Sequence, residues 1–139
     1  MYVLDTNVLS ELRPGKAQQS REVRAWAAGI PDGRIFVSAV TILEQEMGVL
    51  QLERRTPPQG SALRTWFDSV RKAFEGRVLP FTGEVAMRCA ALHVPDRRAF
   101  RDSMIAATTL EHGFTLATRN VRDFEGTGIK LVNPWDHEA

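Results

Sequence analysis

Short apolar runs alternate along the chain with longer segments in which apolar residues recur at helical spacing. Five runs are rich in strand-forming residues, at 2–4, 35–38, 78–81, 114–118 and 129–132. Helical spacing is found between these runs, at 22–28, 40–52, 62–74, 84–94 and 103–112. This alternation is typical of strand–helix–strand crossovers. We therefore predict an α/β fold with three α/β/α layers, in which a mainly parallel five-stranded sheet lies between helices.

The composition is that of one ordinary globular domain. The 139 residues are 43% hydrophobic and 25% charged, and a chain of this length can bury a core without disulfides. The segment 55–60 contains two prolines and is predicted to be a short loop, so we expect one domain over residues 1–139. The net charge of +1 is too even to indicate a polyanion partner by itself.

Cysteine and hydropathy patterns exclude several classes of protein. Cys89 is the single cysteine and the three histidines lie far apart in sequence, which argues against a disulfide framework and against a zinc site. No apolar stretch approaches the roughly 18 residues that a membrane span needs, and the N-terminus lacks the pattern of a signal peptide. We expect a cytoplasmic protein without a membrane segment.

Acidic and amide residues follow the predicted strands, where ligands bind in parallel sheets. These candidates are Asp5, Glu44, Asp102, Asn120 and Asp123. Each also has a purely structural interpretation. Asp5 and Asp102 could cap helices, Thr41 and Glu44 have the spacing of a capping box, and the last two candidates could organise a turn.

A convergence of these carboxylates would need a compensating charge or raised pKa values. Two carboxylates about 4 Å apart repel by about 4 kcal/mol at an effective dielectric constant of 20. Oxygen ligands without histidine or cysteine favour Mg²⁺ or Mn²⁺, and Mg²⁺ usually completes its coordination shell with phosphate oxygens. Hydrolysis of a phosphodiester by a metal-activated water is the chemistry that fits best.

Several short motifs, in order, resemble the PIN-domain family and specifically the VapC and FitB-like toxins of bacterial toxin–antitoxin modules. They are Val3-Leu4-Asp5-Thr6-Asn7-Val8, Glu44 with Gly48, and the segments 101–107, 117–124 and 133–135. The resemblance implies a Mg²⁺- or Mn²⁺-dependent endoribonuclease that is inhibited by a cognate antitoxin protein. It also implies a homodimer that contacts operator DNA only through the antitoxin.

Carried over by motif, the acidic core is Asp5, Glu44 and Asp102. Some relatives have Asp where this chain has Asn120, so either Asn120 as a neutral ligand or Asp123 as a charge completes the site. The residues that look like hydrogen-bonding supports of the acids are Thr6, Asn7 and Thr118. Gln45 and Glu46 depart from the family pattern because they are unusually polar.

Five arginines flank the acidic candidates and are placed to contact RNA phosphates: Arg97, Arg98, Arg101, Arg119 and Arg122. Aromatic residues of the helical segments are expected in the core, and part of this apolar surface is expected to receive an antitoxin segment. Two other functions stay open. One is a PIN-fold binding or regulatory module with weak or no catalysis; the other is a Mg²⁺-dependent phosphatase or phosphotransfer domain.

Overall fold

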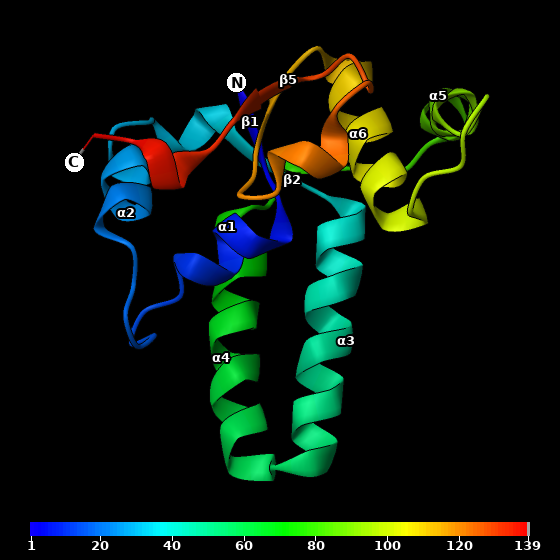
Figure 1. The fold of residues 1–139 in the computed structure, drawn as a ribbon. Helices are drawn as coiled ribbons and strands as arrows, with labels where there is room; N and C mark the ends of the chain where they lie inside the picture. The colour runs from blue at the N-terminus through cyan, green and yellow to red at the C-terminus, as the bar shows by residue number, and fades with distance from the viewer. Residues whose placement is uncertain (139) are drawn as a thin grey trace.

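The five predicted strands lie side by side in one sheet in which every pairing is parallel (Figure 1). The computed structural model describes residues 1–138. The strands are β1 (Tyr2–Leu4), β2 (Ile35–Ser38), β3 (Val78–Leu79), β4 (Thr115–Ala117) and β5 (Lys130–Val132), in the order β3-β2-β1-β4-β5. The predicted α/β/α fold is therefore confirmed, and the sheet is parallel throughout rather than only mainly so.

Helices cover both faces of this sheet (Figure 1). They are α1 (Thr6–Glu11), α2 (Arg21–Ala28), α3 (Ala39–Arg55), α4 (Pro57–Ala73), α5 (Gly83–Leu92) and α6 (Phe100–His112). Short 3-10 helices lie at η1 (Asp32–Arg34), η2 (Val121–Phe124) and η3 (Pro134–Asp136). Within residues 1–138 none of these helices combines the length and the apolar character of a membrane span.

Neighbouring residues of one strand belong to different cores, because side chains of a strand alternate between the two faces of a sheet. Leu4 packs in a cluster that includes Phe67 of α4 and residues of α1 and α2. Val3 packs on the opposite face with Ile105 of α6. Burial on both faces explains why the strands read as continuous apolar runs.

Helices α3 and α4 form an antiparallel hairpin that extends from the body of the domain as a stem (Figure 1). The predicted loop at 55–60 is wrong, because only Thr56 separates the two helices. Pro57 and Pro58 lie in the first turn of α4, where the backbone N–H groups of a helix have no intrahelical partner, so proline costs nothing there.

Close packing at the tip of this stem depends on Gly60. A Cβ atom added at Gly60 would lie 2.4 Å from the Cα atom of Glu53 on α3. Arg64 of α4 also reaches across, and its guanidinium donates to Glu46 at 2.8 Å and to Glu53 at 3.0 Å. The stem is therefore joined by backbone contact and by charge, and Glu46 has a structural partner.

The topology places β1 at the centre of the sheet. From β1 the chain adds β2 and β3 on one side, and later adds β4 and β5 on the other side. The carboxyl end of β1 is thus the switch point at which ligands bind in open parallel sheets.

Candidate acidic site

Asp5 lies directly after β1, at this switch point, and is fully buried. Its Oδ1 atom accepts a hydrogen bond from the backbone N–H of Thr6 at 2.8 Å, so Asp5 is the N-cap of α1. Its Oδ2 atom accepts from the hydroxyl of Thr118 at 2.7 Å and from the side-chain amide of Asn7 at 3.4 Å. The capping interpretation of Asp5 is therefore confirmed, and its role in a catalytic site stays a prediction.

Glu44 projects from the second turn of α3 toward Asp5. The predicted capping box is wrong, because Ser38 is the N-cap of α3 and accepts from the backbone N–H of Thr41 at 3.2 Å. The Oε1 atom of Glu44 instead accepts from the hydroxyl of Thr6 at 2.7 Å. The neighbouring Gln45 is buried and donates to Ser10 of α1 at 3.0 Å, which gives this unusual polar residue a structural role.

Asp102 is the third residue of α6 and does not cap it. The N-cap is Ala99, which offers no side-chain acceptor, so the interpretation of Asp102 as a cap is wrong. Burial raises the pKa of the Asp102 carboxyl, the hydrogen bond and charge of Arg101 oppose this shift, and the charges of Asp123 and Asp5 add to it. The carboxyl of Asp102 thus lies in the field of other acids.

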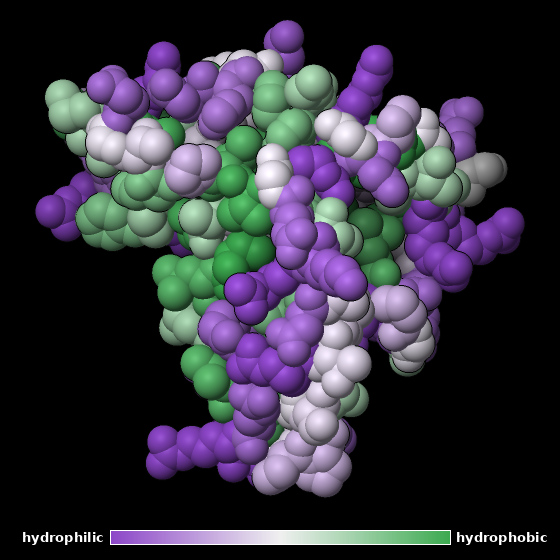
Figure 2. Space-filling view, turned by 180° about the vertical axis from the view of Figure 1, so that it is seen from behind, coloured by the Kyte–Doolittle hydropathy of each residue, from purple (hydrophilic) through white to green (hydrophobic). Residues whose placement is uncertain are grey.

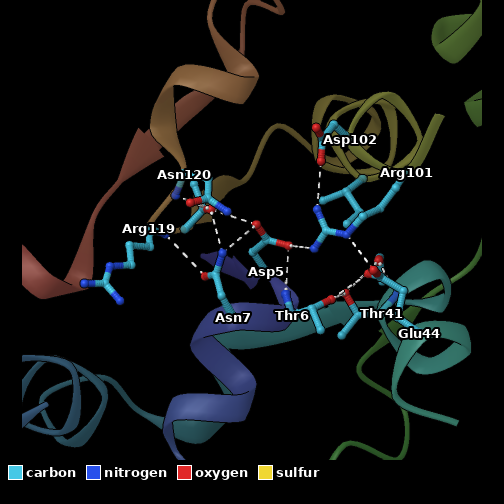
Figure 3. Close-up of polar contacts among 12 residues, drawn as sticks. Asp5, Thr6, Asn7, Thr41, Glu44, Arg101, Asp102, Arg119 and Asn120 are labelled. Atoms are coloured by element: carbon cyan, nitrogen blue, oxygen red, sulfur yellow. Dashed lines mark hydrogen bonds and ion pairs between the residues drawn. The ribbon is translucent and has the colours of Figure 1, made fainter. Parts of the chain in front are cut away.

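One guanidinium joins the three carboxylates (Figure 3). The Nη2 atom of Arg101 donates to Asp5 Oδ1 at 2.6 Å, and its Nε atom donates to Glu44 Oε2 at 2.6 Å. Its Nη1 atom donates to Asp102 Oδ1 at 2.7 Å. Although burial lowers the pKa of Arg101, the charge of Asp5 and the hydrogen bond to Glu44 outweigh it and raise the pKa.

In the structure, the guanidinium of Arg101, a predicted RNA-phosphate contact, forms ion pairs with acids of the same chain. The clustered acids predict a bound cation, whereas in the structure a guanidinium of the chain itself offsets them. The available signal was an arginine directly before an acidic candidate in the first turn of a helix.

Asn120 and Asp123 lie at the rim of the cluster, in the segment after β4. The backbone N–H of Asn120 donates to the hydroxyl of Thr118 at 3.0 Å (Figure 3). Asn120 itself is exposed. Asp123 is also exposed, on η2, and its charge acts on Asp102. The segment lines a shallow pocket formed by Arg119, Asn120, Val121, Arg122 and Asp123.

The other four arginines have different surroundings. Arg97 and Arg122 are exposed. Arg119 lies over the ring of Trp135, with 5.0 Å between the guanidinium carbon and the ring centroid. Arg98 is half-buried and its Nε atom donates to the carbonyl oxygen of Leu92 at 3.2 Å, so it ties the end of α5 to the following segment.

The donor chemistry of the cluster fits a hard divalent cation. Asp5 and Glu44 each have one oxygen held by a threonine hydroxyl and the other directed at the shared guanidinium. As the side chains lie, no group of three or more His, Cys, Asp or Glu residues within 1–138 is spaced to hold a metal ion. The ligand oxygens are present, but Arg101 lies between them.

A parallel sheet between two layers of helices, with carboxylates gathered at its switch point, defines an α/β domain with an acidic site. The PIN domain family matches residues 2–130, and the chain belongs to this family. It is 36% identical to the VapC ribonuclease Y4jK of Sinorhizobium fredii, over 98% of this chain and 99% of that protein. It is 33% identical to toxin FitB of Neisseria gonorrhoeae, over 97% of this chain and 99% of FitB.

Solved structures agree with this assignment. The structure of FitAB bound to a DNA fragment contains a chain that superposes with a TM-score of 0.87 at 32% identity, over 100% of this chain and 99% of that one. VapBC-1 of nontypeable Haemophilus influenzae, at 18% identity and a TM-score of 0.72, shares the fold.

Proposed function

We propose that this chain is the ribonuclease toxin of a toxin–antitoxin pair. The relatives named as a VapC ribonuclease and as toxin FitB match it over nearly their full length. The observation that carries the proposal is the direction of the three carboxylates. Asp5, Glu44 and Asp102 come from three different elements, and each directs an oxygen at the guanidinium of Arg101 at the carboxyl end of β1.

The acids that would hold Mg²⁺ or Mn²⁺ are Asp5, Glu44 and Asp102. A divalent ion bound there would lower the pKa of a coordinated water and stabilise negative charge on a phosphodiester. Thr6 and Thr118 hold one oxygen each of Glu44 and Asp5, which fixes the direction of the remaining oxygens.

The rim of the site supplies groups for the substrate. Asn120 offers an exposed amide, and Asp123 offers an exposed carboxylate. Of the flanking arginines, Arg97, Arg119 and Arg122 are exposed. Because Arg119 lies over the ring of Trp135, we propose the other two as phosphate contacts. Such contacts would give affinity that falls with added salt.

Cleavage of an RNA substrate by the purified chain tests this function. We expect cleavage with Mg²⁺ or Mn²⁺, none after chelation with EDTA, and none for Asp5→Asn or Asp102→Asn. Asp68→Asn, an exposed aspartate of α4, is the matched control and should cleave normally. Cleavage by both site variants would remove these acids from the catalytic role, whereas a folded native chain that stays inactive with Mg²⁺ or Mn²⁺ present would favour a binding module.

An apolar groove supports the proposed antitoxin partner. It has a volume of about 420 Å³, and its lining includes Leu9 of α1, Trp66 of α4, and the residues that follow these helices, Leu12 and Phe74. A groove of this kind suits the apolar face of a peptide helix. Purification with and without the neighbouring gene product tests the partnership; Trp66→Asp should reduce copurification, and normal recovery would contradict this placement. Operator DNA contact is proposed only through that partner.

A homodimer is supported by an exposed apolar stripe on α3. Leu43, Met47 and Leu50 are spaced by four and three residues, so they lie on one side of the helix, and each is more than half exposed. Figure 2 shows hydrophobic surface along this side of the stem. Light scattering should give twice the mass of 15.6 kDa, and Met47→Glu should give the monomer.

A further inference from the structure

The deepest acid of the cluster is closed off from solvent. The Asp5 side chain is 0% exposed, and both of its oxygens already accept hydrogen bonds. Arg101, which covers Oδ1, is 33% exposed and has a long side chain with several rotatable bonds. A cation that is to reach Asp5 from solvent must therefore displace this guanidinium.

We propose that Arg101 is a built-in competitor that occupies the acidic site and that a divalent ion must displace before it can bind. The proposal rests on the proposed function, in that the divalent ion is the one assigned above to the same carboxylates. The competition is direct because the guanidinium binds Asp5 Oδ1 and Glu44 Oε2, the oxygens that the proposed ion would also need.

Charge sets the direction of this competition. Three ionised carboxylates and one guanidinium leave a local charge of −2, whereas three carboxylates and a divalent ion leave −1. The ion therefore compensates the acids better, but the guanidinium is tethered beside Asp102 and has a high effective concentration. The closed state lowers the apparent affinity for metal by the fraction of molecules that are open.

The guanidinium is also bound in a way that an ammonium cannot reproduce. Its Nε, Nη1 and Nη2 atoms each donate to a different carboxylate, and this planar fork spans three elements of the fold. The single nitrogen of a lysine would reach fewer of these acids. Arg101→Lys thus keeps the charge but weakens the closure, while Arg101→Gln removes the charge.

Titration of the full chain with Mn²⁺ alone, without RNA, tests the proposal. Free Mn²⁺ is followed by its electron paramagnetic resonance signal at fixed ionic strength. We expect Arg101→Gln to bind Mn²⁺ at least tenfold more tightly than the native chain, and Arg101→Lys to lie between the two. Arg88→Gln loses the same charge at the exposed ion pair with Glu111 and should bind Mn²⁺ within twofold of the native chain.

A second measurement restores the missing group. Arg101→Ala leaves space for free guanidinium, and millimolar guanidinium should weaken Mn²⁺ binding to this variant but not to Arg88→Gln; tetramethylammonium at equal ionic strength should have no effect on either. Circular dichroism verifies folding, and Arg101→Lys remains available if an uncharged variant does not fold.

Equal Mn²⁺ affinity in the native chain and in Arg101→Gln would show that Arg101 does not compete with the ion. RNA cleavage by the native chain would still support the proposed function in that case. Absence of Mn²⁺ binding in folded Arg101→Gln would overturn the competitor role as well, because no cation site would lie beneath Arg101. Only the absence of metal-dependent RNA cleavage by the native chain would reject the proposed nuclease function.

Discussion

Thr118 offers a direct test of how the acidic site is held. Its hydroxyl is fully buried, donates to Asp5 Oδ2 at 2.7 Å and accepts from the backbone N–H of Asn120 at 3.0 Å. Thr118→Val keeps the shape of the side chain and removes both contacts. A hydrogen bond to a charged group contributes about 1.5–3 kcal/mol, so we expect the free energy of unfolding to fall by about that amount.

This loss corresponds to a fall in Tm of about 5–12 °C for a domain of this size. Hydrogen-bonding partners of metal ligands typically change metal affinity by about 10–100-fold, so Mn²⁺ should bind that much more weakly in Arg101→Gln/Thr118→Val than in Arg101→Gln. Calorimetry and Mn²⁺ titration measure the two effects.

Thr109→Val is the matched control. Thr109 is also fully buried, but its hydroxyl donates at 2.8 Å to the carbonyl of Ile105 one turn earlier in α6 and not to one of the acids. Removing such a bond within a helix is close to neutral. If Thr118→Val lost no more stability and no more Mn²⁺ affinity than its control, the hydroxyl of Thr118 would not be fixing Asp5.

The other predictions concern the stem and its surroundings. Gly60→Ala should lower the free energy of unfolding by about 1–3 kcal/mol in chemical denaturation, because its Cβ would overlap the backbone of Glu53. Gly48 lies in α3 with nothing within 4 Å of an added Cβ, so Gly48→Ala should raise the free energy of unfolding by about 1 kcal/mol. A lower free energy of unfolding would show that the position is packed. Arg64→Met should loosen the hairpin and increase amide exchange in α4, and unchanged exchange would show that its two ion pairs are dispensable.

Much of the fold could be predicted because strand and helix patterns follow from burial. The bounds of β1 and β2 match the predicted runs, and α6 ends at His112, the predicted end of that helical segment, before the αL residue Gly113. The start of α4 could not be predicted from the sequence, because two prolines are equally compatible with a loop and with the first turn of a helix.

The candidate acids could be found because the exits of parallel strands share one edge of the sheet. Their side-chain partners could not be found in the same way. Glu44 has the spacing of a capping box with Thr41, and only the observed cap at Ser38 shows that its carboxylate is used elsewhere. The sequence predicts Arg101 as a phosphate contact, because the direction of its side chain depends on the packing of α6, which no local pattern encodes.

The three acids of the cluster are 39 and 58 residues apart along the chain. They meet only when β1, α3 and α6 are assembled, so the pairing that creates the site is among the most non-local in the molecule. A chain still emerging from the ribosome holds Asp5 and Glu44 long before Asp102 exists. If the chain is the proposed toxin and these acids cut RNA, it is inactive throughout most of its own synthesis, and the proposed antitoxin has that interval in which to bind it.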